Sequence, residues 1–412
     1  MIRMNSRLLR LLALLLALVV FGAACGDDDD DAAGQTETTQ TTAPKIATGP
    51  DTPAAQVRTS LEGMLQEHVV LASAATGAAL GGRPDEFTAA GAALDANSNA
   101  ITEMMSAVFG DEVGQAFDPL WKKHVGFFVD YAQGLAAGDP GKQQKAVADL
   151  TAYTKDFGAF INSALPDLTA DSVAELINTH VLTLKQVVDA QGKKDFTGAY
   201  TGLRTAAAHM GKVAEPLAAS MAATFPDKVS GDPKSKAATL STTLTTALRE
   251  HVFLASSATG AALGGRQDEF MAAAAALEAN SNALTATIGS VYGSDAGKAF
   301  DPLWKKHIGF VIDYTTGVAG KDNAKKDKAV DDLLAYSDDF GAFISGASPE
   351  LTKDTVAELV KTHVLTLKDV VDMQGAKEHT KTYVAIRTAA DHMKMISGPL
   401  ATTIVAQFPD KY

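Results

Sequence analysis

The feature that most constrains the fold of this chain is a long internal repeat. Residues 67–83 read EHVVLASAATGAALGGR and residues 250–266 read EHVFLASSATGAALGGR, so equivalent positions lie 183 residues apart. The block FDPLWKKH begins at Phe117 and again at Phe300, in the same register and without an insertion. A repeat at a fixed offset indicates that one folded unit occurs twice. We therefore predict two domains, at residues 54–229 and 237–412, joined by the turn-rich linker 230–236.

Each repeat contains a second, weaker period of 56 residues. In the first repeat it relates His68, His124 and His180, and in the second it relates His251, His307 and His363. Apolar residues recur at helical spacing around these positions. His68, Asn97, His124, Tyr153, His180 and His209 follow one another at nearly equal intervals. The midpoints of these intervals carry turn-forming or polar pairs, namely Gly82-Arg83, Gly110-Asp111, Gly138-Asp139, Pro166-Asp167 and Lys194-Asp195. The pattern predicts an all-α fold of two tandem six-helix up-and-down bundles, each built of three αα-hairpins.

If the turns lie midway between these positions, the positions themselves share one height in the middle of the bundle. That height also holds Asn97, Tyr153, Asn280 and Tyr336, which we expect either to donate hydrogen bonds around the metal site or to act as polar spacers. Several buried imidazoles at one level are hard to satisfy with one another, and neutral histidine is a common metal ligand. We therefore predict one metal site per repeat, with three or four ligands drawn from His68, His124, His180 and His209, and from His251, His307, His363 and His392.

The predicted ligands restrict the choice of metal or cofactor but do not identify it. Histidine nitrogens without thiolate suit copper or zinc, with iron as a further possibility. A non-covalent haem held by facing histidines is an alternative, and so is a hydrogen-bonded histidine core with a structural or interaction role and no ligand. The chain has no phosphate-binding glycine loop, no His-Glu-x-x-His and no Gly-x-Ser-x-Gly motif. A metal-binding protein is therefore favoured over an enzyme, and no catalytic residue is predicted.

The N-terminus has the features of an export signal. Arg3, Arg7 and Arg10 give a basic start, residues 8–21 are apolar apart from Arg10, and Gly22-Ala23-Ala24 leads to Cys25, the single cysteine of the chain. This order resembles a bacterial lipobox, so we expect residues 1–24 to be a signal peptide and Cys25 to be lipidated. The acidic and Thr-rich residues 25–53 are expected to form a tether. The predicted location is the extracytoplasmic face of the cell membrane, with the protein held by its lipid.

The charge of the chain bears on its partners. The formal net charge is −13, and loss of the three signal-peptide arginines takes it to −16. Such a balance argues against nucleic acid and favours cations such as a metal ion. Arg204 and Arg387 precede His209 and His392 by five residues, and we expect them either to pair with acids such as Asp95 and Asp156 or to face solvent. The sequence does not indicate a protein partner.

The repeated blocks resemble a known module. EHV-LAS-ATGAALGGR-DEF, FDPLWKKH, THVLTLK and FPDK are similar to a helical module of exported proteins of Gram-positive bacteria that is often labelled copper amine oxidase-like. The resemblance covers nearly all of both repeats and implies export and a helical fold. The amine oxidase activity is not implied, because its quinone cofactor requires a Tyr in an Asn-Tyr-Asp/Glu-Tyr setting that this chain lacks.

Overall fold

Helices alone build the part of the chain that the structure, a computed structural model, describes, residues 46–412. The first six helices fall at the places that the turn pattern predicts, and this confirms the all-α fold. The predicted signal peptide, Cys25 and most of the predicted tether lie outside the described residues. The helices of the first half are α1 (Pro53–Leu80), α2 (Pro84–Phe109), α3 (Asp111–Ala137), α4 (Pro140–Ala164), α5 (Ala170–Gly192) and α6 (Phe196–Thr224).

The second half repeats this order residue for residue. Every helix begins and ends 183 positions after its counterpart, so the sequence repeat is also a repeat of helix boundaries. Within residues 46–412 there are twelve helices and no strand. The helices of the second half are α7 (Lys236–Leu263), α8 (Gln267–Tyr292), α9 (Ser294–Gly320), α10 (Asn323–Ala347), α11 (Lys353–Gly375) and α12 (His379–Gln407).

Short polar turns set the helix boundaries. The side chains of Thr52, Asp139 and Thr169 each accept a hydrogen bond from a free amide in the first turn of the helix that follows. Gly110 separates α2 from α3 with a φ of 97°, and Gly138 ends α3 in the left-handed region with a φ of 62°. Residues without a Cβ adopt these angles at little cost, so glycine fixes both turns.

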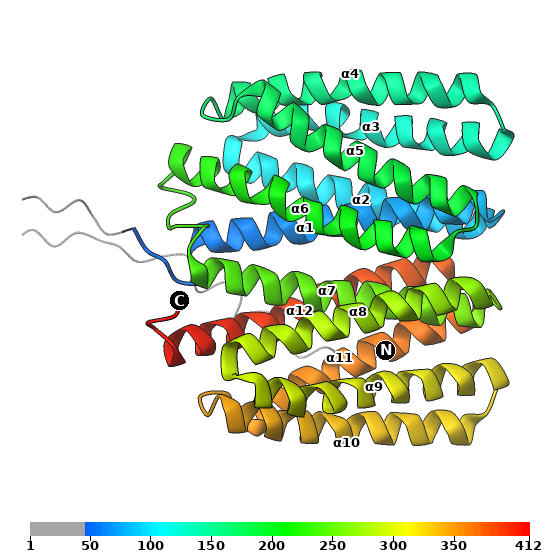
Figure 1. The fold of residues 1–412 in the computed structure, drawn as a ribbon, viewed down its shortest axis with the longest axis vertical. Coiled ribbons are helices and arrows are strands. Elements are labelled where there is room, and N and C mark those ends of the chain that lie inside the picture. Colours follow the sequence, from blue (N-terminus) through cyan, green and yellow to red (C-terminus); the bar gives the residue numbers. More distant parts are fainter. Residues whose placement is uncertain (1–45) are drawn as a thin grey trace, which may run out of the picture. The chain divides into compact units, whose positions relative to one another are not determined.

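Each half is a closed ring of helices around a histidine-containing core. Consecutive helices pack against each other, and α6 returns to α1 as α12 returns to α7 (Figure 1). The odd-numbered helices α1, α3 and α5 also contact one another across the ring, and so do α7, α9 and α11. Three helices in each half therefore face the middle of the ring, where side chains at equal height meet.

The two halves pack together along equivalent helices. α1 packs on α7, α2 packs on α12 and α6 packs on α8. The hydroxyls of Thr59 and Thr242, which are equivalent residues of the two repeats, lie 2.7 Å apart. Equivalent residues meet in this way where a two-fold pseudo-symmetry axis passes between two copies. Residues 46–412 accordingly form one compact unit.

The last residues of the predicted tether and the predicted linker also belong to this unit. The amide of Asp232 donates to the carbonyl of Ala47, and the Ser235 hydroxyl donates to the carbonyl of Thr48. The amide of Ala54 donates to the carbonyl of Ser230. These bonds hold the start of α1 against the connection between the repeats.

Ion pairs between arginine and glutamate side chains link the two halves. Arg204 on α6 lies 2.9 Å from Glu250 on α7, and Arg387 on α12 lies 2.5 Å from Glu67 on α1. The sequence-based expectation for these arginines, pairing with Asp95 and Asp156 or exposure to solvent, was wrong. Their partners lie in the other repeat, where no spacing along one helix could indicate them.

Candidate metal centre

Two groups of three histidines lie at the centres of the two rings, and we call them the first and second triads. The first triad consists of His68 on α1, His124 on α3 and His180 on α5, and all three side chains are buried. Within each triad, one ring nitrogen from each histidine lies within 4.8 Å of the others. The second triad consists of His251 on α7, His307 on α9 and His363 on α11.

The local sequence places each histidine on the inner face of its helix. On α5, His180 follows Ile177 and precedes Leu184, at helical spacing, and both neighbours are buried. On α3, His124 lies between Trp121 and Phe128 on the buried face. Because α1, α3 and α5 contact one another across the ring, histidines at one height on these faces converge.

The distances between ring nitrogens suit a metal ion. Nε2 of His124 lies 3.2 Å from Nε2 of His68, and Nε2 of His307 lies 3.3 Å from Nε2 of His251. Two nitrogens bound tetrahedrally at zinc–nitrogen distances of about 2.0–2.1 Å lie about 3.3 Å apart. The same separation also fits one hydrogen bond between two neutral rings. The Nε2–Nε2 distance therefore fits both a metal ion and a hydrogen bond between two rings. The hydrogen-bond partners of the third histidine distinguish these two possibilities.

Several triad nitrogens have no hydrogen-bond partner among the described residues. Nδ1 of His68 and Nδ1 of His180 are buried without a partner in the first triad. In the second triad this holds for Nδ1 of His251 and for both ring nitrogens of His363. A buried polar atom without a partner is costly, and core packing alone leaves both ring nitrogens of His363 unsatisfied.

Burial keeps the triad histidines neutral. Loss of solvation lowers the pKa of His124 to about 4 and that of His180 to about 3. The same cause lowers the pKa of His307 to about 4 and that of His363 to about 3. The pKa of His68 is also well below its ordinary value because of burial. A neutral imidazole is the form that binds metal, so no proton has to leave these rings at neutral pH.

Aromatic side chains form the wall of the first triad. The Trp121 ring lies 4.8 Å from the His68 ring and 4.7 Å from the His124 ring, between centroids, and its Nε1 donates to the Ser98 hydroxyl. Tyr153 stacks on His124 at 5.0 Å with an interplanar angle of 22°. Burial raises the pKa of Tyr153 well above its ordinary value, so the phenol stays protonated. Trp304 and Tyr336 repeat these contacts around the second triad.

The structure does not bring His209 and His392 into the triads. Nε2 of His209 lies 2.9 Å from the carbonyl oxygen of Leu176, and Nε2 of His392 lies 2.9 Å from that of Leu359. These histidines are on α6 and α12, even-numbered helices that do not face the middle of the ring. Shared height did not imply shared position around the ring, so three of the four candidate ligands in each repeat come together.

Of the polar residues predicted to surround the ligands, the tyrosines contact a triad and the asparagines bond to backbone carbonyls instead. Asn97 donates to the carbonyl of Met64 at 3.1 Å, and Asn280 donates to the carbonyl of Ala247 at 3.0 Å. These bonds tie the second helix of each ring to the first. Tyr153 and Tyr336 do reach a triad, but they stack on a histidine ring instead of donating a hydrogen bond to it.

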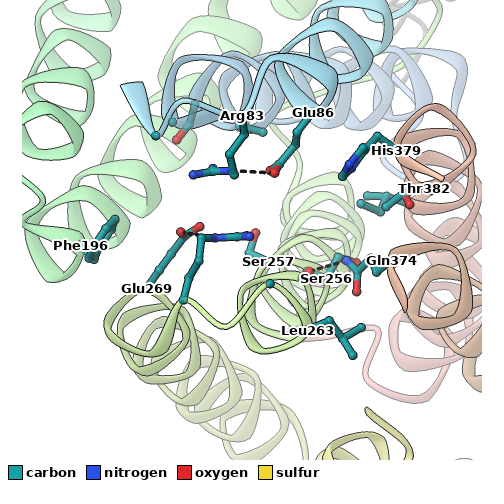
Figure 2. A pocket seen from close by; sticks show the side chains of 18 of the residues that line it. Arg83, Glu86, Phe196, Ser256, Ser257, Leu263, Glu269, Gln374, His379 and Thr382 are labelled. Carbon is teal, nitrogen blue, oxygen red and sulfur yellow. Dashed lines mark hydrogen bonds and ion pairs between the residues drawn. The ribbon is translucent and has the colours of Figure 1, made fainter. Parts of the chain in front are cut away.

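A large cavity lies away from both triads, between the two halves. It encloses about 1010 Å³ and is lined by equivalent residues of both repeats. Figure 2 shows Arg83 and Glu86 on one side of it and Glu269 on the other. Arg83 pairs with Glu86 at 2.7 Å, and Arg266 pairs with Glu269 at 2.7 Å. These four charged side chains therefore neutralise each other in pairs. No triad residue lines the cavity.

Comparison with protein-family models, with curated proteins and with solved structures found no match for this chain. Among residues 46–412, no helix is both long and apolar enough to cross a membrane.

Proposed function

We propose that the protein is an exported metal-binding protein that holds one transition metal ion in each histidine triad. The observation that carries this proposal is the convergence of three buried, neutral histidines in each half, several of whose ring nitrogens have no hydrogen-bond partner among the described residues. Because the arrangement occurs twice with the same geometry, the protein would bind two equivalents of metal.

The alternative of a hydrogen-bonded core accounts for less of the geometry. A neutral imidazole offers one donor and one acceptor. In the second triad, His307 and His251 can satisfy one nitrogen each by bonding to each other, but His363 has no partner among the described residues for either nitrogen. A metal ion at the meeting point would take one nitrogen from every member of the triad.

Copper and zinc suit three neutral nitrogen donors best. Imidazole binds zinc, copper, iron and nickel, whereas magnesium and calcium prefer oxygen. Haem is disfavoured by the available space, because the rings of the first triad lie 5.2–6.3 Å apart between centroids. The free volume next to that triad is about 40 Å³, too small for a porphyrin.

The proposed location follows from the N-terminal sequence alone. The run of small residues before Cys25 supports lipidation, and the acidic residues after it support a tether at the extracytoplasmic face of the cell membrane. A metal-binding protein at this place would take up or buffer copper or zinc outside the cytoplasm.

Metal analysis of variants tests the proposal. The untagged protein should bind about two equivalents of copper or zinc, and His124→Ala with His180→Ala should reduce this to about one. His209→Ala should leave two equivalents, because His209 bonds to a backbone carbonyl, and His379→Ala outside the triads is the second control. Metal binding should raise the melting temperature, and a chelator should reverse this. Absence of metal after exposure to Cu(I), Cu(II), Zn(II) and Fe(II), with an unchanged melting temperature, would leave the hydrogen-bonded core as the better account.

A further inference from the structure

A narrow pocket of about 40 Å³ adjoins the first triad. It touches His68 and His124, two of the three predicted ligands. The other lining residues come from α1, α2, α3 and α5, and most are small or apolar: Ala72, Ala75, Ala79, Leu94, Phe128 and Leu184.

The pocket extends from the triad toward the surface. On α1 its lining positions are His68, Ala72, Ala75 and Ala79, which lie on one face of the helix. At 1.5 Å per residue these positions span about 16 Å of the helix. Ala72 and Ala75 are buried, Ala79 is half-buried, and Gln133 on α3 is exposed. Small alanines on α1 thus leave a passage between solvent and the histidines.

The lining is unsuited to water. An ordered water in a cavity needs two to four polar partners. Apart from the histidines, the polar residues of the lining are Thr76 and the exposed Gln133. The Thr76 hydroxyl already contacts the carbonyl of Ala72 at 3.0 Å and Oε1 of Gln191 at 2.8 Å, and Oε1 of Gln133 accepts from Nζ of Lys142 at 2.7 Å. A free volume of 40 Å³ exceeds that of a single water but excludes organic substrates. A small apolar molecule fits both the size and the chemistry.

We propose that the first triad, loaded with reduced copper, binds a diatomic gas through this pocket. This inference rests on the proposed metal site. Three histidines leave one tetrahedral position of the metal open, and the pocket touches two of the ligands that surround it. Dioxygen, carbon monoxide and nitric oxide share the required chemistry, since each is small and apolar and donates to a soft metal ion. The step is one of coordination alone, with no bond broken and no electron supplied from elsewhere.

Carbon monoxide is the probe that tests this inference. His307→Ala with His363→Ala removes the second triad, so that copper occupies the first one. The anaerobic Cu(I)-loaded variant should then bind about one equivalent of carbon monoxide per copper and show a C–O stretching band in the infrared. Adding Ala75→Phe should fill the pocket and abolish the band while the copper content stays unchanged. Ala258→Phe, the equivalent change in the second repeat, is the matched control and should leave the band intact.

A second variant protects the test against misfolding. Ala79 is half-buried nearer the surface, so Ala79→Phe should obstruct the passage with little strain on the core. Loss of the band in either folded variant supports the inference. Bound copper without a carbon monoxide band overturns it and leaves the metal site standing, as does a band that survives both substitutions. Failure to bind copper at all would overturn the proposed function and this inference together. Dioxygen and nitric oxide are then compared as competitors of the bound carbon monoxide.

Discussion

Arg249 and Glu67 form an ion pair between the two repeats that is almost completely buried. Nη2 of Arg249 lies 2.5 Å from Oε2 of Glu67, and the two side chains are 1% and 3% exposed. Glu67 also receives Nε of Arg387 at 2.5 Å, and Arg249 reaches Asp391 at 2.5 Å. The residue equivalent to Arg249 in the first repeat is Gln66, so this pair breaks the symmetry of the interface.

Removal of Arg249 should destabilise the protein strongly. Arg249→Ala leaves the Glu67 carboxylate buried with Arg387 as its remaining cation, and loss of one partner of a buried pair costs about 3–5 kcal/mol. Denaturant unfolding measures this change in the free energy of unfolding. Lys298→Ala is the control, because Lys298 and its partner Asp295 are 75% and 94% exposed, and such pairs contribute little. Equal effects of the two substitutions would contradict the role assigned to the buried pair.

The sequence predicted the repeat, the helices and the height of the histidines, because each depends on spacing along the chain. All five predicted turns of the first half fall at a junction between consecutive helices. Height in the bundle does not by itself give position around the ring. The 56-residue period relates His68, His124 and His180, whereas His209 belongs with Asn97 and Tyr153 on even-numbered helices. That grouping was a signal available in the sequence that would have separated the triads from His209.

The contacts between the two repeats could not be predicted from spacing along the chain. Glu67 and Arg387 are 320 residues apart, and Thr59 and Thr242 are 183 apart. No helical period links residues at such separations. The pairing depends on which face of α1 packs on α7, and this is set by packing of the whole unit.

The metal-free protein should lose stability as the pH falls below about 6.5. Burial holds the pKa of His124 at about 4 and that of His180 at about 3, both below the ordinary value of 6.5. Between these values the unfolded chain binds more protons than the folded chain, so acid favours unfolding by up to about 1.4 kcal/mol per pH unit for each histidine. Denaturant unfolding from pH 7 to pH 4 measures the slope. His180→Gln with His363→Gln should make it shallower, His379→Gln should not, and an unchanged slope in the triad variant would refute the burial argument.

A glycine in place of Lys321 should stabilise the second repeat. Lys321 ends α9 in the left-handed region with a φ of 55°, whereas the equivalent residue of the first repeat is Gly138, with a φ of 62°. A side chain at such angles costs about 1–2 kcal/mol. Substitution by glycine removes this cost, but the greater freedom of glycine in the unfolded chain offsets part of the stabilisation. We expect Lys321→Gly to raise the free energy of unfolding by roughly 0.5–1 kcal/mol. Gly138→Lys should have the opposite sign, and two effects of the same sign would contradict this account.

Gly158 should tolerate no side chain, although it lies inside a helix where alanine is usually preferred. A Cβ built at Gly158 would lie 2.3 Å from the carbonyl oxygen of Ala170, which is backbone at the start of α5 and cannot rotate away. Gly158→Ala should therefore force α4 and α5 apart and destabilise the protein by about 1–3 kcal/mol. Gly126 is the matched control, since it is exposed in the middle of α3 and a Cβ there meets nothing within 4 Å. Gly126→Ala should stabilise the protein by up to about 1 kcal/mol, because alanine favours helix over glycine. If thermal unfolding showed the same sign for both substitutions, helix propensity and not the close approach of α4 to α5 would govern Gly158.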